Sequence, residues 1–230
     1  MPNAVREIFK EIPRTYELIN HILTFGMDIF WRRRTAKAAA VVSGKNKIDL
    51  CSGTGETASY LKNYSKNGSQ IYAVDFCLPM LKEAAKKPQC RNIKFTAGEI
   101  KKLPFADNSF DAATISFATR NINTSRASLI AGFKEIHRIL KPGGHFFNLE
   151  TSQPSSLILR KLFHFYIKLL VASVGGAISG SARAYKYLST TIPLFYSAGE
   201  LADILREAEF KEVRFKKIFF GIAAIHHCLK

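Results

Sequence analysis

The chain has 230 residues, of which 47% are hydrophobic and 23% are charged. This length and composition suit one folded domain with a sizeable core and exclude wholesale disorder. The net charge of +16 predicts an anionic partner or surface, such as nucleic acid, membrane lipid or an acidic substrate, with a general basic bias of the proteome as the alternative.

The first 42 residues are expected to be helical. Apolar residues recur at three- and four-residue steps over 4–25, and Pro13 interrupts them. The only tryptophan, Trp31, then stands beside three arginines in 25–34. This segment is either an amphipathic helix with a solvated basic face or a lid that contacts a membrane. An alanine-rich helix over 35–42 completes the predicted lid.

Strands and helices alternate between residues 43 and 150. The predicted strands are 47–50, 70–75, 92–96, 112–116 and 145–149, and the predicted helices are 57–63, 79–87 and 128–140. This alternation predicts a doubly wound, mostly parallel α/β sheet of the Rossmann-like kind. Ligands of such sheets bind at the carboxyl ends of the strands. Polar residues at the predicted strand ends should therefore line one edge: Asp49, Asp75, Glu99, Ser116 and Glu150.

Residues 151–196 break this alternation. No Asp or Glu occurs between Glu150 and Glu200, and 157–170 is rich in apolar side chains. Basic residues and a histidine within 157–170 make a transmembrane span improbable. The composition favours an insert that covers an apolar ligand or lies on anionic lipid, with an ordinary pair of core helices as the alternative. A helix over 200–207 and a hairpin of 213–220 and 222–228 close the chain.

A glycine turn follows the first predicted strand, in Asp49-Leu50-Cys51-Ser52-Gly53-Thr54-Gly55-Glu56. The turn lacks the third glycine of the dinucleotide fingerprint and the lysine of a P-loop. Asp75 suits a ribose diol, because a carboxylate accepts hydrogen bonds from both hydroxyls. Glu99 would accept a hydrogen bond from an adenine amino group. These features favour a sulfonium cofactor with an adenosine end, whose methionyl part would approach the small residues 53–55.

Several motifs resemble the ubiquinone/menaquinone-biosynthesis C-methyltransferases, which are class I S-adenosylmethionine-dependent methyltransferases. They are the pattern Phe9, Tyr16, Asn20, Gly26 and Trp31-Arg32, the glycine turn with Asp75, Leu103–Asp111, Thr114–Asn121 (TISFATRN), Leu140–Gly144 (LKPGG), and Tyr185–Leu188 followed by Ile192. The resemblance covers nearly the whole chain. It implies one methyltransferase domain, 1–230, with a helical lid (1–42), a cofactor-binding core (43–150), a substrate- or membrane-facing insert (151–196) and a closing helix and hairpin (197–230).

The resemblance also implies the reaction, which is methyl transfer to a ring carbon of a prenylated quinol. Demethylmenaquinol is the favoured acceptor and a benzoquinol of the ubiquinone pathway is the alternative. The implied cofactor-binding residues are Asp49, Gly53, Thr54, Gly55, Ala58, Asp75, Glu99, Ile100 and Ser116. The chain departs from the family at four positions. Ala58 stands where a threonine is usual, Glu99 where Asn or Asp is usual, Ala118 where a glycine is usual, and Glu209, before Phe210, where a glycine is common.

Candidates for the acceptor side follow from the chemistry. A cation beside the developing phenolate would stabilise it, and Arg120, oriented by Asn121, is the candidate; a structural pairing of Arg120 with Asp111 or Glu150 is the alternative. His145 or a water chain would take the proton, although His145 also suits a plain strand position. Tyr185 and Tyr187 are candidates for lining the quinone pocket, or for packing. No metal site is expected.

The expected partners are the prenylated quinol and an anionic membrane surface. The four cysteines have no metal or disulfide spacing, and 1–7 is no signal peptide, so a cytoplasmic protein on the inner face of the membrane is expected. No nucleic-acid partner is expected, because no RNA-binding module is recognised. A homodimer is compatible with the sequence. The alternatives are a methyltransferase for another lipid, small molecule or RNA, and an inactive scaffold.

Overall fold

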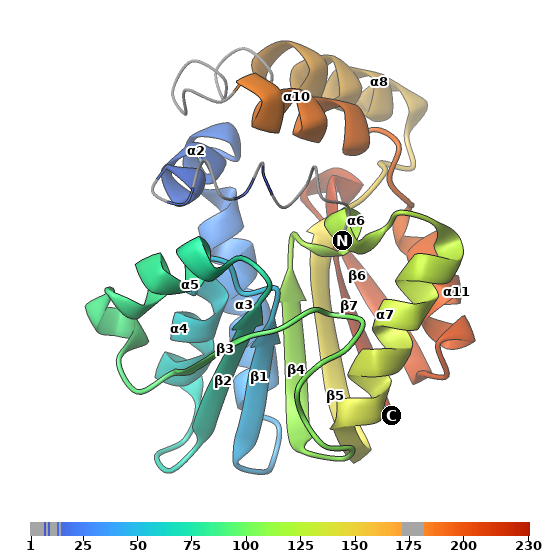
Figure 1. The fold of residues 1–230 in the computed structure, drawn as a ribbon. Helices are drawn as coiled ribbons and strands as arrows, with labels where there is room; N and C mark the ends of the chain where they lie inside the picture. Colours follow the sequence, from blue (N-terminus) through green and yellow to red (C-terminus); the bar gives the residue numbers. More distant parts are fainter. Residues whose placement is uncertain (1–6, 8, 10–12, 14, 172–181) are drawn as a thin grey trace.

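The computed structural model describes residues 7, 9, 13, 15–171 and 182–230. It contains one seven-stranded sheet with helices on both faces, which confirms the predicted doubly wound α/β fold (Figure 1). The strands are β1 (Asn46–Leu50), β2 (Gln70–Asp75), β3 (Lys94–Ala97), β4 (Phe110–Ser116), β5 (Leu140–Thr151), β6 (Lys211–Ile218) and β7 (Ala223–Leu229). The α-helices are α2 (Tyr16–Leu23), α3 (Met27–Ala40), α4 (Glu56–Tyr64), α5 (Leu78–Ala85), α6 (Thr119–Ile122), α7 (Arg126–Ile139), α8 (Leu157–Tyr166), α10 (Ala182–Thr191) and α11 (Ala198–Glu207). The shorter turns are η1 (Pro88–Cys90), η2 (Ile167–Val171) and η3 (Phe219–Gly221).

The strand order is β3-β2-β1-β4-β5-β7-β6. Strands β1 to β5 run parallel, and β7 pairs antiparallel with both β5 and β6. The order reverses between β1 and β4, because Leu50 pairs with Val74 on one side and with Ile115 on the other. Such a switch point leaves a crevice at the carboxyl ends of the strands, where ligands of this fold bind.

The two faces of the sheet are covered by different helices. Ile48 and Leu50 are fully buried in one cluster with apolar residues of α7 and α11. Ala73 and Phe147 belong to a second cluster, with residues of α3 and α4. This division follows from the alternation of side chains along a strand. It predicts that alternate residues of β1 face different layers of the molecule.

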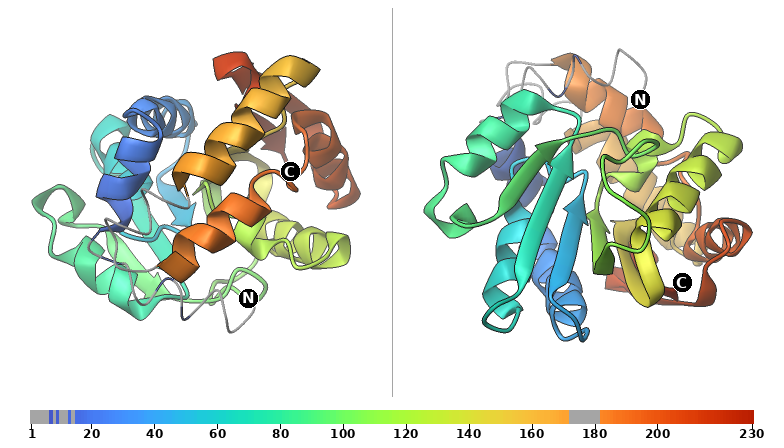
Figure 2. Two further views of the ribbon diagram at one scale, coloured as in Figure 1. Left: turned by 90° about the horizontal axis from the view of Figure 1, so that it is seen from above. Right: turned by 60° about the horizontal axis from the view of Figure 1, so that its bottom comes forward.

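Helix α2 and the insert helices α8 and α10 lie together above the carboxyl edge of the sheet (Figures 1 and 2). A buried cluster joins Phe9 and Ile19 to Phe163 and Leu188 of the insert. The hydroxyl of Tyr166 also donates a hydrogen bond to the carbonyl of Leu23. The N-terminal segment and the insert are therefore packed against each other. Among the described helices, none is both long and apolar enough to cross a membrane.

Some local expectations are corrected. Lys141–Gly144 ends helix α7 as predicted, but these residues already belong to β5, which starts at Leu140. Residues 119–122 form the short helix α6 directly after β4. In α3, Trp31 and Arg32 are buried, whereas Arg33 and Arg34 are exposed. Trp31 is buried because α3 packs against β4 and β5, whereas Phe25 and Phe30 of the same segment are exposed.

Candidate active site

The glycine turn joins β1 to α4 through several residues in the left-handed backbone region. Cys51, Gly53 and Gly55 have φ values of 50°, 55° and 79°. A Cβ on Gly55 would lie 3.0 Å from the Cβ of Ala84, so this position needs glycine for space as well as for conformation. The turn is closed by a hydrogen bond of 2.9 Å from the Gly55 N–H to the Ser52 carbonyl.

Asp75 ties this turn to the end of β2. Its carboxylate accepts the N–H of Gly53 at 2.8 Å and that of Cys77 at 2.7 Å. Burial raises the pKa of Asp75 to about 6, and these N–H donors partly oppose the rise. The acid expected at the second strand end therefore lies against the glycine turn, as the spacing predicted.

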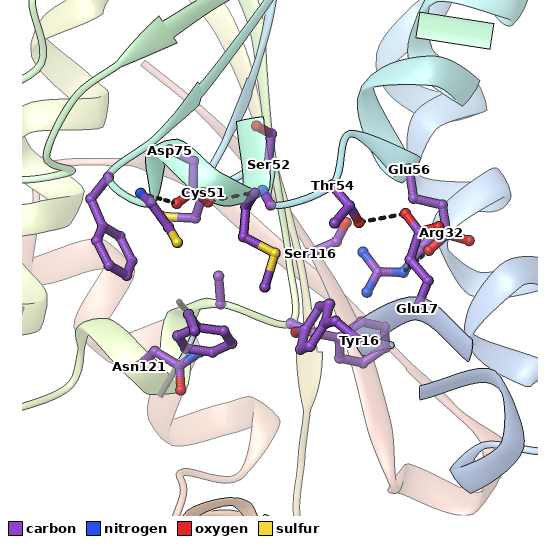
Figure 3. A pocket seen from close by; sticks show the side chains of 17 residues that line it. Tyr16, Glu17, Arg32, Cys51, Ser52, Thr54, Glu56, Asp75, Ser116 and Asn121 are labelled. Atoms are coloured by element: carbon purple, nitrogen blue, oxygen red, sulfur yellow. Dashed lines mark hydrogen bonds and ion pairs between the residues drawn. The ribbon is translucent and has the colours of Figure 1, made fainter. Parts of the chain in front are cut away.

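A cavity of about 40 Å³ lies between the turn, Asp75 and the carboxyl end of β4 (Figure 3). We call it the polar cavity. Of the predicted site residues, it is lined by Gly53, Thr54, Asp75, Ser116 and Asn121. The side-chain oxygens of Ser52 and Ser116 and Oδ1 of Asn121 are buried there and have no hydrogen-bond partner among the described residues. Buried polar atoms of this kind indicate a polar ligand that completes their hydrogen bonds.

The N-terminal segment closes the polar cavity. Glu17 accepts hydrogen bonds from the Thr54 hydroxyl and from the Lys87 ammonium, which also donates to the Thr54 carbonyl at 2.9 Å. The ring of Phe9 lies 6.4 Å from that of Phe76, which directly follows Asp75. Helix α2 is therefore latched onto the glycine turn.

A second cavity, of about 400 Å³, lies between α2, α3, α8, α10 and η3. We call it the apolar cavity. Its apolar lining residues are Leu23, Phe25, Trp31, Leu159, Leu162, Phe163, Tyr166, Ile167, Leu188, Ile192, Phe219, Phe220 and Ile222. Arg120 and Thr151 supply part of a polar floor. Tyr16, Arg32 and Phe117 line both cavities, so the cavities adjoin.

Arg120 is held at this floor by its neighbours on β5. One terminal guanidinium nitrogen lies 3.2 Å from Oε1 of Glu150 and 3.2 Å from the hydroxyl of Thr151. The alternative pairing with Glu150 is therefore present, whereas Asp111 binds Lys141. The expected orientation of Arg120 by Asn121 is not seen, because Oδ1 of Asn121 accepts no hydrogen bond from any described residue. Glu150 and Thr151 orient the guanidinium instead.

Several predicted cofactor residues line neither cavity. Asp49 is buried behind the turn, where it accepts hydrogen bonds from the Thr114 hydroxyl at 2.6 Å and from the backbone of Ala58. Burial raises the pKa of Asp49 to about 7. Ile100 is buried in the main core. Beyond the end of β3, the backbones of Glu99 and Lys102 form an isolated antiparallel β-bridge. Gly55, Ala58, Glu99 and Ile100 also lie outside the lining of the polar cavity.

Three candidates for the acceptor side have other outcomes. His145 lines neither cavity, and its Nδ1 lies 2.8 Å from Nε2 of His227. A role for His145 as the base therefore has no support. Tyr185 and Tyr187 belong to α10, but their side chains lie outside the described residues.

Sequence reasoning assigned no role to three residues that line the polar cavity, Tyr16, Glu17 and Arg32. The family resemblance could have pointed to two of them, because Tyr16 and Arg32 belong to the N-terminal pattern of the family. Arg32 donates to the Thr57 hydroxyl at 3.2 Å, and its guanidinium lies 5.0 Å from the centre of the Phe117 ring. The basic segment therefore contributes to the site by burial of one arginine.

One group among the described residues has the geometry of metal ligands. His21, Asp28 and Glu56 bring ligand atoms within 4.8 Å of one another. His21 Nδ1 lies 2.9 Å from Asp28, and Nε of Arg32 lies 3.3 Å from Glu56. Because the guanidinium already offsets the charge of the carboxylates, we assign no metal to this group.

The whole chain resembles proteins of known families. Residues 2–230 match the model of the ubiE/COQ5 methyltransferase family. A demethylmenaquinone methyltransferase of Geobacillus kaustophilus is 35% identical over 96% of this chain and 94% of its own length. The ubiquinone/menaquinone biosynthesis C-methyltransferase UbiE of Desulfotalea psychrophila is 35% identical over 99% of this chain and 90% of its own.

Solved structures support the fold. A SAM-dependent methyltransferase from Aquifex aeolicus superposes with a TM-score of 0.61 at 17% identity, covering 88% of this chain and 91% of its own. A phosphoethanolamine N-methyltransferase of Haemonchus contortus, solved with S-adenosyl-L-methionine, superposes with a TM-score of 0.60 at 13% identity. The latter match covers 87% of this chain and 52% of the other.

Proposed function

The chain belongs to the ubiE/COQ5 methyltransferase family, and from this premise we propose that it transfers a methyl group from S-adenosylmethionine to a ring carbon of a prenylated quinol. Demethylmenaquinol is the acceptor that we favour, because several relatives are named demethylmenaquinone methyltransferases. A benzoquinol of ubiquinone biosynthesis is the alternative, which the name of another relative includes. The main observation behind the proposal is that a small polar cavity lies directly beside a large apolar cavity.

The residues of the polar cavity fit the cofactor. Three buried side-chain oxygens have no hydrogen-bond partner among the described residues; they belong to Ser52, Ser116 and Asn121. The carboxylates of Glu17 and Asp75 also line this cavity and would attract a cationic molecule. Asp75 would accept hydrogen bonds from both ribose hydroxyls. When bound, the cofactor would supply an electrophilic methyl group. The ring carbon would bond to this methyl group as the sulfur–methyl bond breaks, the cofactor would leave as a neutral thioether, and the proton on that carbon would pass to water.

The N-terminal helices would act as a lid over this cofactor. The polar cavity measures about 40 Å³, whereas sites for small ligands usually measure about 300 Å³ or more. Phe9, Tyr16 and Glu17 fill part of the space, so they must move when the cofactor enters. Their return would exclude water from the reacting atoms.

The apolar cavity would hold the quinol. Burial of each CH₂ of a prenyl tail contributes about 0.8 kcal/mol, so an apolar lining of this size favours a long tail. At the polar floor, Arg120 would bind a ring oxygen and stabilise its negative charge after the phenolic proton is lost. Glu150 would hold the guanidinium in position for this contact.

The mouth of the apolar cavity would lie on an anionic membrane. Phe25 and Phe220 line the cavity and are 81% and 76% exposed. Lys161 and Lys168 are exposed on α8 and η2, the elements that supply Leu159, Leu162 and Ile167 to the cavity lining, and 151–199 contains no acidic residue. An apolar rim with basic neighbours suits the interface of an anionic bilayer, from which a prenylated quinol could enter the cavity directly.

The reaction is tested with the purified protein and methyl-labelled S-adenosylmethionine. We expect label in a prenylated dihydroxynaphthalene, less in the matching benzoquinol and none in total RNA. Calorimetry of cofactor binding separates an inactive scaffold from an enzyme with another acceptor. Label in RNA alone, or cofactor binding without transfer to either quinol, would contradict the proposed function.

The membrane contact is tested by flotation with vesicles. We expect Lys161→Gln with Lys168→Gln to reduce binding to anionic vesicles, and Phe25→Ser with Phe220→Ser to reduce binding further. Val41→Ser, which changes an exposed apolar residue at the end of α3, is the matched control. Equal flotation of all variants would exclude this rim as the contact surface.

A further inference from the structure

Two buried arginines line the apolar cavity, and each has a side-chain N–H that forms no hydrogen bond with a described residue. Arg32 and Arg120 both line this cavity and are each 7% exposed. The Nε of each is buried and has no hydrogen-bond partner among the described residues. An unsatisfied buried N–H costs free energy, so the pair indicates a ligand that carries acceptor atoms for both.

The two guanidiniums are anchored independently. Arg120 is held by Glu150 and Thr151 at the end of β5. Arg32 comes from α3 and is held by the Thr57 hydroxyl and by the charge of Glu56, whose Oε2 lies 3.3 Å from Nε without forming a hydrogen bond. Because the anchors differ, both cations are fixed before a ligand binds.

Tyr16 lies near both cations and lines the same cavity. Burial raises the pKa of Tyr16, and the nearby charges of Arg32 and Arg120 oppose that rise. Tyr16 also lines both cavities. The polar floor therefore places two fixed cations near one partly buried ring, at the boundary between the two cavities.

The N–H groups of Arg32 suit the acceptor better than the sulfonium of the cofactor. A guanidinium only donates hydrogen bonds, so it can bind a phenolic oxygen but not a sulfonium. We propose that Arg32 is a second acceptor-binding residue, which holds one ring oxygen while Arg120 holds the other. The site then selects rings with two oxygens at opposite positions. This inference rests on the proposed function, and it names the feature of the acceptor that the floor recognises.

The test compares two acceptors that have the same prenyl tail, a 1,4-dihydroxynaphthalene and the matching 1-naphthol. We expect Arg32→Gln to lower kcat/KM for the dihydroxy acceptor by about 10- to 100-fold, because a hydrogen bond to a charged group is lost. For the monohydroxy acceptor, whose single oxygen binds at Arg120, we expect a change below about threefold. Arg32→Lys, which keeps the charge and loses Nε, should fall between wild type and Arg32→Gln.

Arg33→Gln is the matched control. Arg33 is the next residue of α3, is exposed, and lies over the ring of Tyr60 at 5.2 Å, outside both cavities. We expect it to leave both kcat/KM values unchanged. Cofactor affinity is measured by calorimetry for each variant, and a large loss of affinity identifies a variant that has lost the lid or the fold. If Arg32→Gln is such a variant, Arg32→Lys is compared with wild type instead.

Two outcomes separate the possible failures. If wild type methylates the dihydroxy acceptor and the Arg32 variants lose activity equally on both acceptors, Arg32 is structural and this inference is wrong. If wild type binds the cofactor but methylates neither acceptor, the proposed function itself is wrong.

Discussion

The polar and apolar cavities adjoin but are built in different ways. The polar cavity, of about 40 Å³, is formed mainly by the strand ends and the turn that follows β1. The apolar cavity, of about 400 Å³, is formed by helices that are far apart in the sequence. The first offers directed hydrogen bonds from fixed backbone and buried polar atoms, and the second offers apolar area. Donor and acceptor binding should therefore respond to different mutations.

The residues at the boundary are the exception to this separation. Tyr16, Arg32 and Phe117 line both cavities, and Arg120 reaches the floor of the apolar one. Changes at the boundary should affect the chemical step, whereas changes deeper in either cavity should affect only one ligand. The following experiments test this division.

The largest effect is expected for Arg120→Gln. Removing the cation that faces the developing phenolate should lower kcat by about 10²- to 10³-fold, the usual cost of one oxyanion donor. Cofactor affinity should stay unchanged, because Arg120 does not line the polar cavity. Steady-state kinetics and calorimetry measure the two quantities. Arg126→Gln, which changes an exposed arginine paired with Glu207, is the control. An equal loss of cofactor affinity would assign Arg120 to the polar cavity instead.

Asp75→Asn should weaken cofactor binding by about 10- to 100-fold, because a charged hydrogen-bond acceptor is replaced by a neutral amide. The KM of the quinol should stay within about threefold of wild type. Titration calorimetry gives the first value and kinetics at saturating cofactor the second. Asp203→Asn, on the exposed surface of α11, serves as the control. A large change in quinol KM would mean that the two cavities are not independent.

Leu162→Asp should raise the KM of a prenylated acceptor by about tenfold, since a charge at the apolar cavity removes favourable burial of the tail. The same ring without a tail should be methylated as by wild type. Val41→Asp, at the exposed end of α3, is the matched control. If both acceptors are affected equally, the apolar cavity does not hold the tail.

Cofactor affinity should depend on pH through Asp75. Burial raises the pKa of Asp75 to about 6, so the carboxylate becomes protonated as pH falls through that value. The neutral acid accepts fewer hydrogen bonds, and the Kd should rise by up to about tenfold for each pH unit below 6, while it stays flat above 7. Calorimetry between pH 5 and 8 measures this profile, and Asp75→Asn should flatten it. A break near 7 would instead indicate Asp49, whose pKa burial raises to about 7.

The smallest effect is expected for Glu17→Gln. The latch of Glu17 on Thr54 and Lys87 is partly exposed, and such pairs contribute about 0–1 kcal/mol. Cofactor association and dissociation should each become about threefold faster, because the lid opens more easily. Stopped-flow fluorescence of Trp31, the only tryptophan, reports the rates. Slower association would show that Glu17 attracts the cofactor rather than holding the lid closed.

The sequence by itself determined the sheet and the edge at which the glycine turn and Asp75 lie. The alternation of strands and helices was sufficient for the fold, and residues 51–56 with Asp75 were identified as a ligand-binding edge. These features depend on contiguous motifs and on the rule that parallel strands end at one edge. Hydrophobic periodicity, which reports local structure, therefore carried most of this information.

Only the tertiary structure decided which side chains meet at the boundary. Arg120 pairs with Glu150, 30 positions away, and Arg32 turns inward although its neighbours Arg33 and Arg34 are exposed. Neither outcome follows from spacing, because a basic segment of a helix has the same composition whichever face is buried. The packing of α2 and α3 above the sheet, and of the insert against them, brings Tyr16 and Arg32 to the glycine turn. Contacts between distant segments thus created the second cavity and the polar floor that joins it to the first.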